Sequence, residues 1–160
     1  MSWIQQIDFM ILEWIQSHLQ GAALDLLMPM ITTLGNGGWL FILLALVLLL
    51  SKRYRRQGCA LAVSLLLCLL VGNLFLKPLF ARLRPFEVAG LSELLISPPT
   101  DYSFPSGHTM ASFACAGVFW HYRRNFGRWS VVLLLLAALI GFSRLYLYVH
   151  FPTDVLCGAL

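Results

Sequence analysis

The chain has 160 residues, of which 59% are hydrophobic and only 11% are charged, and its mean hydropathy is +0.80. Soluble domains carry roughly 25% charged residues, and disordered chains are poor in hydrophobic residues, so this composition excludes both classes. It indicates a single all-α domain, 1–160, built as an integral membrane helical bundle.

The basic residues are concentrated in two short loops between apolar runs. Seven of the eleven Lys and Arg residues lie there: Lys52, Arg53, Arg55, Arg56, Arg123, Arg124 and Arg128. By the positive-inside rule, we expect both loops to face the cytoplasm. The alternative is a soluble protein with basic patches for nucleic acid, but the flanking runs are too long and too apolar for that. We therefore expect no nucleic-acid partner.

The N-terminal segment, 1–20, is predicted to form an interfacial helix. Apolar residues recur at helical spacing over 3–19, while polar residues such as Asp8 and Glu13 fill the other face. Such a helix suits the membrane interface, and packing against the other helices is compatible with that placement. No basic residue precedes Lys52, which argues against a cleavable signal peptide.

About five to six transmembrane or re-entrant helices are predicted after this segment. They cover 22–34, 39–50, 57–76, 106–121, 130–149 and a last helix from Pro152 that we expect to be cut short at Leu160. Gly35-Asn36-Gly37-Gly38 breaks the first from the second. We interpret Asn36 as part of this break rather than as a residue that lines a substrate entrance. The segment 77–105, with prolines and acids, is predicted to be an extracytoplasmic loop.

Three polar segments converge on the outer face in this topology: 77–85, 105–108 and 143–154. They hold the remaining cations and two histidines, namely Lys77, Arg82, Arg84, Arg144, His108 and His150. One such cluster could simply anchor a helix end. Three on one face predict a site for a multiply charged anion. The planar arginine guanidinium can donate to two phosphate oxygens at once, and the lysine ammonium adds a concentrated positive charge.

Local patterns in these segments suggest how an anion would be bound and attacked. Ser106 is a natural N-cap, so the backbone N–H groups of 106–108 can face an anion, and Gly107 permits close approach. His150 and Asp154 share a helix face, so the carboxylate can orient the imidazole and stabilise its cation. With two histidines in the site, one can attack phosphorus while the other donates a proton to the leaving oxygen. A metal site is the alternative, but the neighbouring cations repel a metal.

Together these residues resemble the type 2 phosphatidic acid phosphatase family, which is related to vanadium-dependent haloperoxidases. The three parts of the family signature are Lys-x6-Arg-Pro, Pro-Ser-Gly-His and Ser-Arg-x5-His-x3-Asp. They occur here in order as Lys77…Arg84-Pro85, Pro105-Ser106-Gly107-His108 and Ser143-Arg144…His150…Asp154. The resemblance covers 77–154, about half of the chain.

The resemblance implies a role for each signature residue. His150 would form a phospho-histidine, Asp154 would orient it, and His108 would protonate the leaving group and later help to activate water. The phosphate oxygens would be held by Lys77, Arg84, Ser106, Gly107 and Arg144. The resemblance implies no metal and no cofactor. Arg82 lies outside the signature, and we interpret it as a loop or headgroup charge that could extend the site toward a diphosphate.

The implied activity is metal-independent hydrolysis of a lipid phosphate or diphosphate on the extracytoplasmic face of a bacterial plasma membrane. Undecaprenyl diphosphate, phosphatidic acid and phosphatidylglycerophosphate are the candidate substrates, and membrane lipids are the expected partners. A phosphotransferase that uses the same site is the main alternative. A non-enzymatic anion-binding or transport protein is a third, although the predicted spans carry almost no charge.

Overall fold

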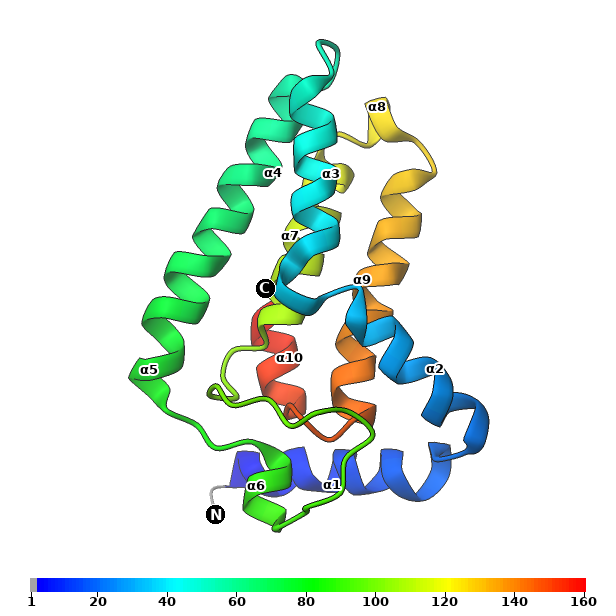
Figure 1. Cartoon of the computed structure of the whole chain (residues 1–160), viewed down its shortest axis with the longest axis vertical. Helices are drawn as coiled ribbons and strands as arrows, with labels where there is room; N and C mark the ends of the chain where they lie inside the picture. The colour runs from blue at the N-terminus through cyan, green and yellow to red at the C-terminus, as the bar shows by residue number, and fades with distance from the viewer. Residues whose placement is uncertain (1–2) are drawn as a thin grey trace.

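The structure, a computed structural model, describes residues 3–160, and within that range it consists of helices and connecting segments without a strand (Figure 1). The elements are α1 (Trp3–Leu19), α2 (Ala22–Thr33), η1 (Asn36–Gly38), α3 (Trp39–Leu50), α4 (Arg55–Leu67), η2 (Cys68–Leu76), α5 (Lys77–Phe80), α6 (Pro85–Ala89), α7 (Gly107–His121), α8 (Arg123–Phe126), α9 (Trp129–Tyr146) and α10 (Pro152–Ala159). The predicted all-α class is confirmed. Residues 1 and 2 of the predicted interfacial helix lie outside the described residues.

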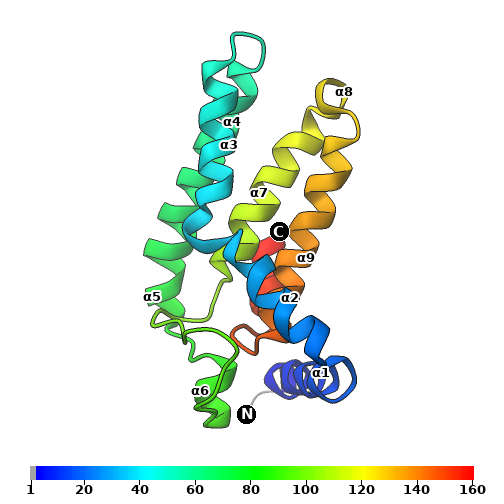
Figure 2. The ribbon, with the colours of Figure 1, turned by 45° about the vertical axis from the view of Figure 1, so that its right-hand side comes forward.

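Two helical hairpins form the body of the molecule. α3 packs on α4, α7 packs on α9, and contacts between α4 and α7 join the pairs, which diverge toward one end (Figure 2). α3 is apolar all round, yet only Phe41, Ala45 and Leu48 are buried in it. A helix that exposes leucines on every other side is suited to contact with lipid rather than water.

Within residues 3–160, three helical stretches are long and apolar enough to cross a membrane: Ala22–Leu50, Arg55–Ala89 and Trp129–Tyr146. They support a membrane protein, whereas the predicted count of five to six transmembrane or re-entrant helices is not confirmed. α7 has 15 residues, so it extends roughly 22 Å. That length falls short of the hydrocarbon core, which is about 30 Å thick.

The break between α2 and α3 occurs where the glycines predict it. Gly37 and Gly38 have φ of 57° and 68°, the left-handed region that glycine adopts without a steric cost. The break lets α2 lean against α9 while α3 stands against α4. It also turns the backbone of 35–38 toward the N-terminal end of α7, which contacts η1.

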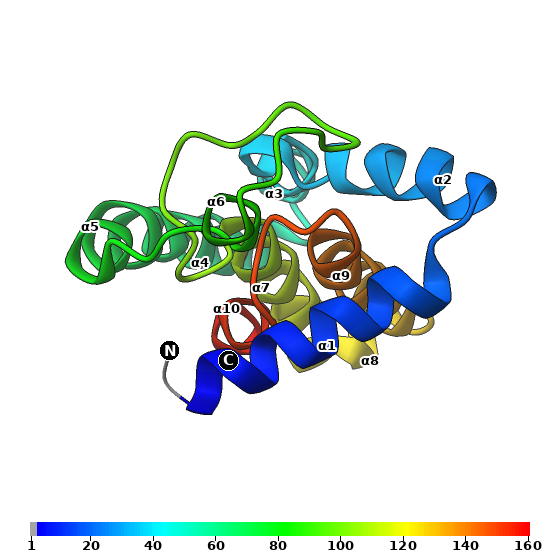
Figure 3. The ribbon, with the colours of Figure 1, turned by 90° about the horizontal axis from the view of Figure 1, so that it is seen from below.

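α1 lies across one end of the bundle, against α9 and α10 (Figure 3). The predicted apolar stripe, which includes Trp3, Met10 and Trp14, is exposed, as an interfacial helix requires. Ile15 of the predicted stripe is buried instead and packs on the protein together with Leu12, and Asp8 is only 1% exposed. The expectation of an ordinary polar face is therefore wrong for Asp8, because it is paired inside the molecule.

The segment 77–105 differs from the predicted simple loop. Lys77–Phe80 continues the helix of α4 and η2, and Pro85–Ala89 forms a further short helix before an irregular stretch leads into α7. Both basic loops, by contrast, lie together at the end of the bundle opposite α1 (Figure 1).

Candidate active site

A cavity of about 1080 Å³ opens between α3, α4 and the start of α7. One end is polar and contains Lys77, Arg84, Asp101, His108, Arg144 and His150. The other end is lined by aliphatic side chains of α3 and α4, among them Ile42, Leu46, Leu49, Leu65 and Leu66. The apolar part follows α3 from Gly38 to Leu49, which corresponds to roughly 16 Å of helix.

The predicted site residues fall into two layers. Six of them line the cavity: Lys77, Arg84, Gly107, His108, Arg144 and His150. Ser106 and Asp154 lie behind these and are completely buried. The fold therefore brings all three signature segments to one place.

Ser106 occupies the N-cap position of α7 but makes no capping bond through its side chain. Its hydroxyl accepts a hydrogen bond from Thr109 Oγ1 at 2.9 Å, and its N–H donates to the backbone oxygen of Asp154 at 3.1 Å. The expectation that this N–H faces an anion is therefore wrong. The N–H groups of Gly107 and His108, at the start of the helix, remain suited to that role.

Asp101 pairs with two of the predicted phosphate ligands. Its carboxylate forms ion pairs with Lys77 and with Arg84, the latter at 2.6 Å. Burial opposes ionisation of Asp101, but hydrogen bonds and charge from Lys77 and Arg84 outweigh it and lower its pKa to about 2. The Asp101 side chain is 56% exposed, so it can leave the pair without disturbing the core.

Arg84 has further bonds that hold it in place. Its Nη1 donates to the Val149 oxygen at 2.6 Å, and its Nε donates to the Asp101 oxygen at 2.8 Å. The same Nη1 lies 3.2 Å from His150 Nε2. Arg84 therefore links the irregular segment before α7 to the turn that carries His150.

Of the three Lys and Arg residues that line the cavity, Arg144 is the one without an ion pair among the described residues. It is only 2% exposed, its Nη1 donates to Thr32 Oγ1 at 2.6 Å, and its Nε has no hydrogen-bond partner among residues 3–160. No carboxylate of the described chain lies in ion-pair distance of it. A buried cation without an ionic partner favours the binding of an anion.

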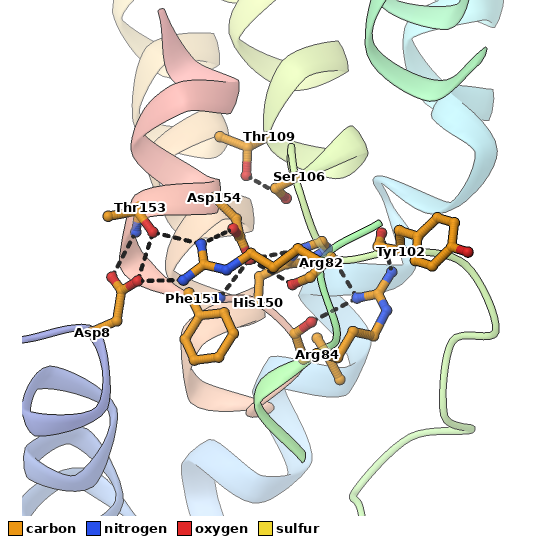
Figure 4. Close-up of polar contacts among 12 residues, drawn as sticks. Asp8, Arg82, Arg84, Tyr102, Ser106, Thr109, His150, Phe151, Thr153 and Asp154 are labelled. Carbon is orange, nitrogen blue, oxygen red and sulfur yellow. Dashed lines mark hydrogen bonds and ion pairs between the residues drawn. The ribbon is translucent and has the colours of Figure 1, made fainter. Parts of the chain in front are cut away.

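His150 lies between Arg84 and Asp154 and is 1% exposed. Its Nδ1 is 3.6 Å from Asp154 Oδ2, whereas Nε2 faces Arg84 (Figure 4). Burial, followed by the charges of Arg84 and Arg144, lowers the pKa of His150 well below its usual range. The imidazole is therefore neutral at physiological pH, the form that can act as a nucleophile.

His108 is positioned by the break between α2 and α3. Its Nε2 lies 2.9 Å from Asn36 Oδ1, and a Cβ on Gly35 would come within 2.7 Å of its Cδ2. The predicted break is confirmed, and Asn36, the first residue of η1, lines the cavity as well, so the two interpretations are compatible. The sequence offered no signal for this pairing, because 72 positions separate the two residues.

Arg82 lies in the loop between α5 and α6, as the first of its two interpretations has it, but it is not the free charge that was expected. It does not line the cavity, and its guanidinium instead binds Asp8 and Asp154 (Figure 4). Together with Asp101 and Asn36, Asp8 is a site residue that the motifs do not identify. All three come from parts of the chain outside the three signature motifs.

Comparison with known proteins agrees with this geometry. Residues 57–160 match the model of the PAP2 superfamily. The chain is 34% identical over 145 residues to an undecaprenyl-diphosphatase of Sulfolobus acidocaldarius, a match that covers 90% of this chain and 68% of that protein. It is 32% identical over 140 residues to undecaprenyl-diphosphatase BcrC of Bacillus subtilis, covering 88% of this chain and 69% of the relative.

Solved structures show the same architecture. The crystal structure of Aquifex aeolicus LpxE has a TM-score of 0.81 at 28% identity, covering 96% of this chain and 88% of that one. A transmembrane PAP2-type phosphatidylglycerolphosphate phosphatase from Bacillus subtilis has a TM-score of 0.79 at 24% identity, covering 99% and 80%, which supports the fold. The resemblance inferred from the three motifs is confirmed: the chain belongs to the PAP2 superfamily.

Proposed function

We propose that this PAP2 protein hydrolyses the phosphate or diphosphate group of a membrane lipid through a phospho-histidine intermediate on His150. The observation that carries the proposal is the cavity, which joins a cationic end to an apolar end within one continuous space. The cationic end matches a phosphate, and the apolar end between α3 and α4 matches the first part of a hydrocarbon chain.

The chemistry follows from the orientation of the two histidines. Bound phosphate offsets the charges of the neighbouring cations, so His108 takes up a proton when the substrate binds. His150 Nε2 attacks phosphorus and breaks its bond to the leaving oxygen, which takes the proton from the His108 imidazolium and leaves that ring neutral. Asp154 stabilises the positive charge on the phosphorylated imidazole. Water, deprotonated by His108, then attacks phosphorus, releases inorganic phosphate and restores neutral His150.

The charge that develops on the phosphate oxygens is stabilised by Lys77, Arg84 and Arg144, together with the N–H group of Gly107. Because Lys77 and Arg84 are paired with Asp101 in the substrate-free protein, the Asp101 carboxylate has to yield its place to the phosphate. Arg144 needs no such exchange.

The relatives support undecaprenyl diphosphate as the first substrate to test, since two of them are named undecaprenyl-diphosphatases. Phosphatidic acid and phosphatidylglycerophosphate are the other candidates. A phosphotransferase would use the same intermediate with an alcohol or a phosphate in place of water. We further propose that the site faces the outside of a bacterial plasma membrane, because both basic loops lie at the opposite end of the bundle (Figure 1).

The test uses the purified chain in detergent with EDTA and a panel of these three lipids, and measures released phosphate. We expect hydrolysis without added metal and a loss of about a thousandfold or more in His150→Ala, because the nucleophile is gone. His18→Ala, an exposed position on α1, is the matched control. Unchanged activity in His150→Ala or strict metal dependence would contradict the mechanism. Transfer of phosphate to an added lipid alcohol instead of water would favour the phosphotransferase.

A further inference from the structure

Hydrogen-bond donors hold both oxygens of the Asp154 carboxylate. Its Oδ1 accepts a hydrogen bond from Arg82 Nη1 at 2.5 Å. Its Oδ2 accepts from Ser103 Oγ at 2.5 Å and from the Phe151 N–H at 2.8 Å, and the same oxygen is the one nearest to His150. The orientation of Asp154 therefore depends on a set of donors that the family signature does not contain.

Arg82 is itself fixed on several sides. Its Nη2 donates to Asp8 Oδ2 at 2.7 Å, and its Nη1 also donates to Thr153 Oγ1 at 2.7 Å. The guanidinium carbon lies 4.0 Å from the centre of the Phe151 ring, a cation–π contact. Only 25% of the side chain is exposed, so Arg82 is a bridge between two carboxylates (Figure 4).

Asp8 completes the bridge from the interfacial helix. Its Oδ1 accepts from the Thr153 N–H at 3.0 Å, and its Oδ2 accepts from the Thr153 hydroxyl at 2.6 Å. The carboxylates of Asp8 and Asp154 are both almost fully buried, at 1% and 0% exposure. Buried carboxylates without a cation are strongly unfavourable, so the single guanidinium serves both.

We propose that Arg82 and Asp8 are positioning residues that clamp Asp154 against His150, an inference that rests on the proposed nucleophilic role of His150. Through Asp154, which faces Nδ1 of the His150 ring, the clamp links this ring to α1, a helix outside the signature. Arg82 contacts neither the cavity nor the expected position of the phosphate, so it acts through Asp154 alone.

The physical need for the clamp arises during the reaction. Once His150 is phosphorylated, its ring is positively charged and Asp154 is the nearest carboxylate. A carboxylate free to rotate would lose part of its stabilising effect, whereas one held at both oxygens keeps its orientation throughout. Arg82 also balances the charge of Asp154 in the free enzyme, which helps to keep His150 neutral.

The experiment compares the wild-type 160-residue chain with Arg82→Met, Arg82→Lys and Asp8→Asn, using the lipid phosphate that the wild type hydrolyses fastest in the panel. Glu13→Gln, an exposed acid on the same helix, is the matched control. The readouts are kcat, KM, the inhibition constant of vanadate as a phosphate mimic, and thermal unfolding. Vanadate binding reports on the phosphate site without requiring turnover.

For Arg82→Met we expect kcat to fall by about tenfold to a hundredfold while KM and vanadate inhibition change by less than about threefold. Arg82→Lys should recover part of kcat, because it keeps the charge, and Asp8→Asn should give a smaller loss in kcat alone. A weaker vanadate inhibition with kcat retained would overturn the proposal and make Arg82 a phosphate ligand. If Arg82→Met does not fold, Asp8→Asn takes its place in the test. An unchanged kcat in Asp8→Asn would then overturn the proposal that Arg82 and Asp8 position Asp154.

A second measurement does not depend on turnover. The pKa of His150 can be followed by NMR in protein labelled with 15N-histidine, and it should be higher in Arg82→Met, because Asp154 then acts on the imidazole with its full charge. The other charged or titratable groups around His150 are unchanged in the variant: Arg84, Arg144, Lys77 and His108. An unchanged pKa would contradict the clamp. A wild type that hydrolyses no lipid of the panel would contradict the proposed function, and the NMR result would still decide the role of Arg82.

Discussion

At the scale of single residues, the Asp101 carboxylate occupies hydrogen-bond donors that a bound phosphate would need. It pairs with Lys77 and Arg84, two of the three cations that line the cavity, and it leaves Arg144 without an acid partner among the described residues. The planar carboxylate and the tetrahedral phosphate both present anionic oxygens, so they compete for the same Lys and Arg donors. Asp101 therefore lowers the affinity of the free site for any phosphate.

Removal of this carboxylate should strengthen phosphate binding. For Asp101→Asn we expect the inhibition constant of vanadate to fall by about threefold, a modest effect because the pair is partly exposed to solvent. The pKa of Asp101 is lowered to about 2, below the value of an unfolded aspartate, so the carboxylate stays ionised between pH 8 and pH 5. The difference in vanadate inhibition between variant and wild type should therefore be constant over this range.

The matched control for this change is Glu93→Gln, an exposed acid in the same segment, which should leave inhibition unchanged. Weaker vanadate binding in Asp101→Asn would show instead that the carboxylate holds Lys77 and Arg84 in their binding positions. A difference that disappears as the pH falls from 8 to 6 would contradict the lowered pKa.

At the scale of elements, the break between α2 and α3 decides where His108 lies. The break places Gly35 against the His108 ring and Asn36 Oδ1 at 2.9 Å from its Nε2. Because an amide oxygen can only accept, Nε2 carries a proton in both the neutral and the charged ring, and Nδ1 is left to exchange the catalytic proton with the leaving oxygen and with water. A helix break that would otherwise be only a hinge thus orients the proposed acid.

A methyl group at the break should disturb this orientation. In Gly35→Ala the new Cβ would lie 2.7 Å from His108 Cδ2, so the ring has to move and kcat should fall by about tenfold. Gly117→Ala is the control within α7, because nothing lies within 4 Å of its Cβ position. That change should leave kcat unaltered and stabilise the helix by about 0.5–1 kcal/mol. Equal kcat in the two variants would contradict the role of the break.

At the scale of the whole molecule, the charges divide into two ends. The basic loop before α4 and the basic residues around α8 lie together at one end, and α1 lies across the other (Figures 1 and 2). The polar end of the cavity is closer to α1, since Asp8 of α1 is linked through Arg82 to Asp154. One orientation in the membrane therefore satisfies both the positive-inside rule and an outward-facing site.

Cysteine labelling in intact bacterial cells tests this orientation. After the four native cysteines are replaced by alanine, Glu93→Cys should react with a membrane-impermeant maleimide, whereas Asn125→Cys should react only after the membrane is opened. Both positions are exposed, so accessibility within the protein is matched. The reverse pattern would place the site on the cytoplasmic side.

The sequence by itself determined the all-α class, the membrane setting and the membership of the PAP2 superfamily. Composition sets the solvent, and glycine and proline mark helix ends through local backbone preferences. The spacing of His150 and Asp154 also predicted that they lie close to each other, which is confirmed. The predicted reason, a shared helix face, is wrong, because α10 begins at Pro152 and His150 lies in the turn before it. These conclusions depend on neighbours within one or two helical turns.

Only the tertiary structure decided which charges pair. Arg82 and Arg84 are two positions apart and both basic, yet one binds Asp8 from 74 positions away and the other binds Asp101. Similarly, Asn36 meets His108 only because α2 and α3 bend at that point. Ion pairs form between the charged groups that the packed helices bring within a few ångströms of each other. Where such a group is buried, loss of its partner leaves an uncompensated charge and destabilises the fold. Sequence spacing carries no information about such distances, so the partners that position the site emerged only from the folded chain.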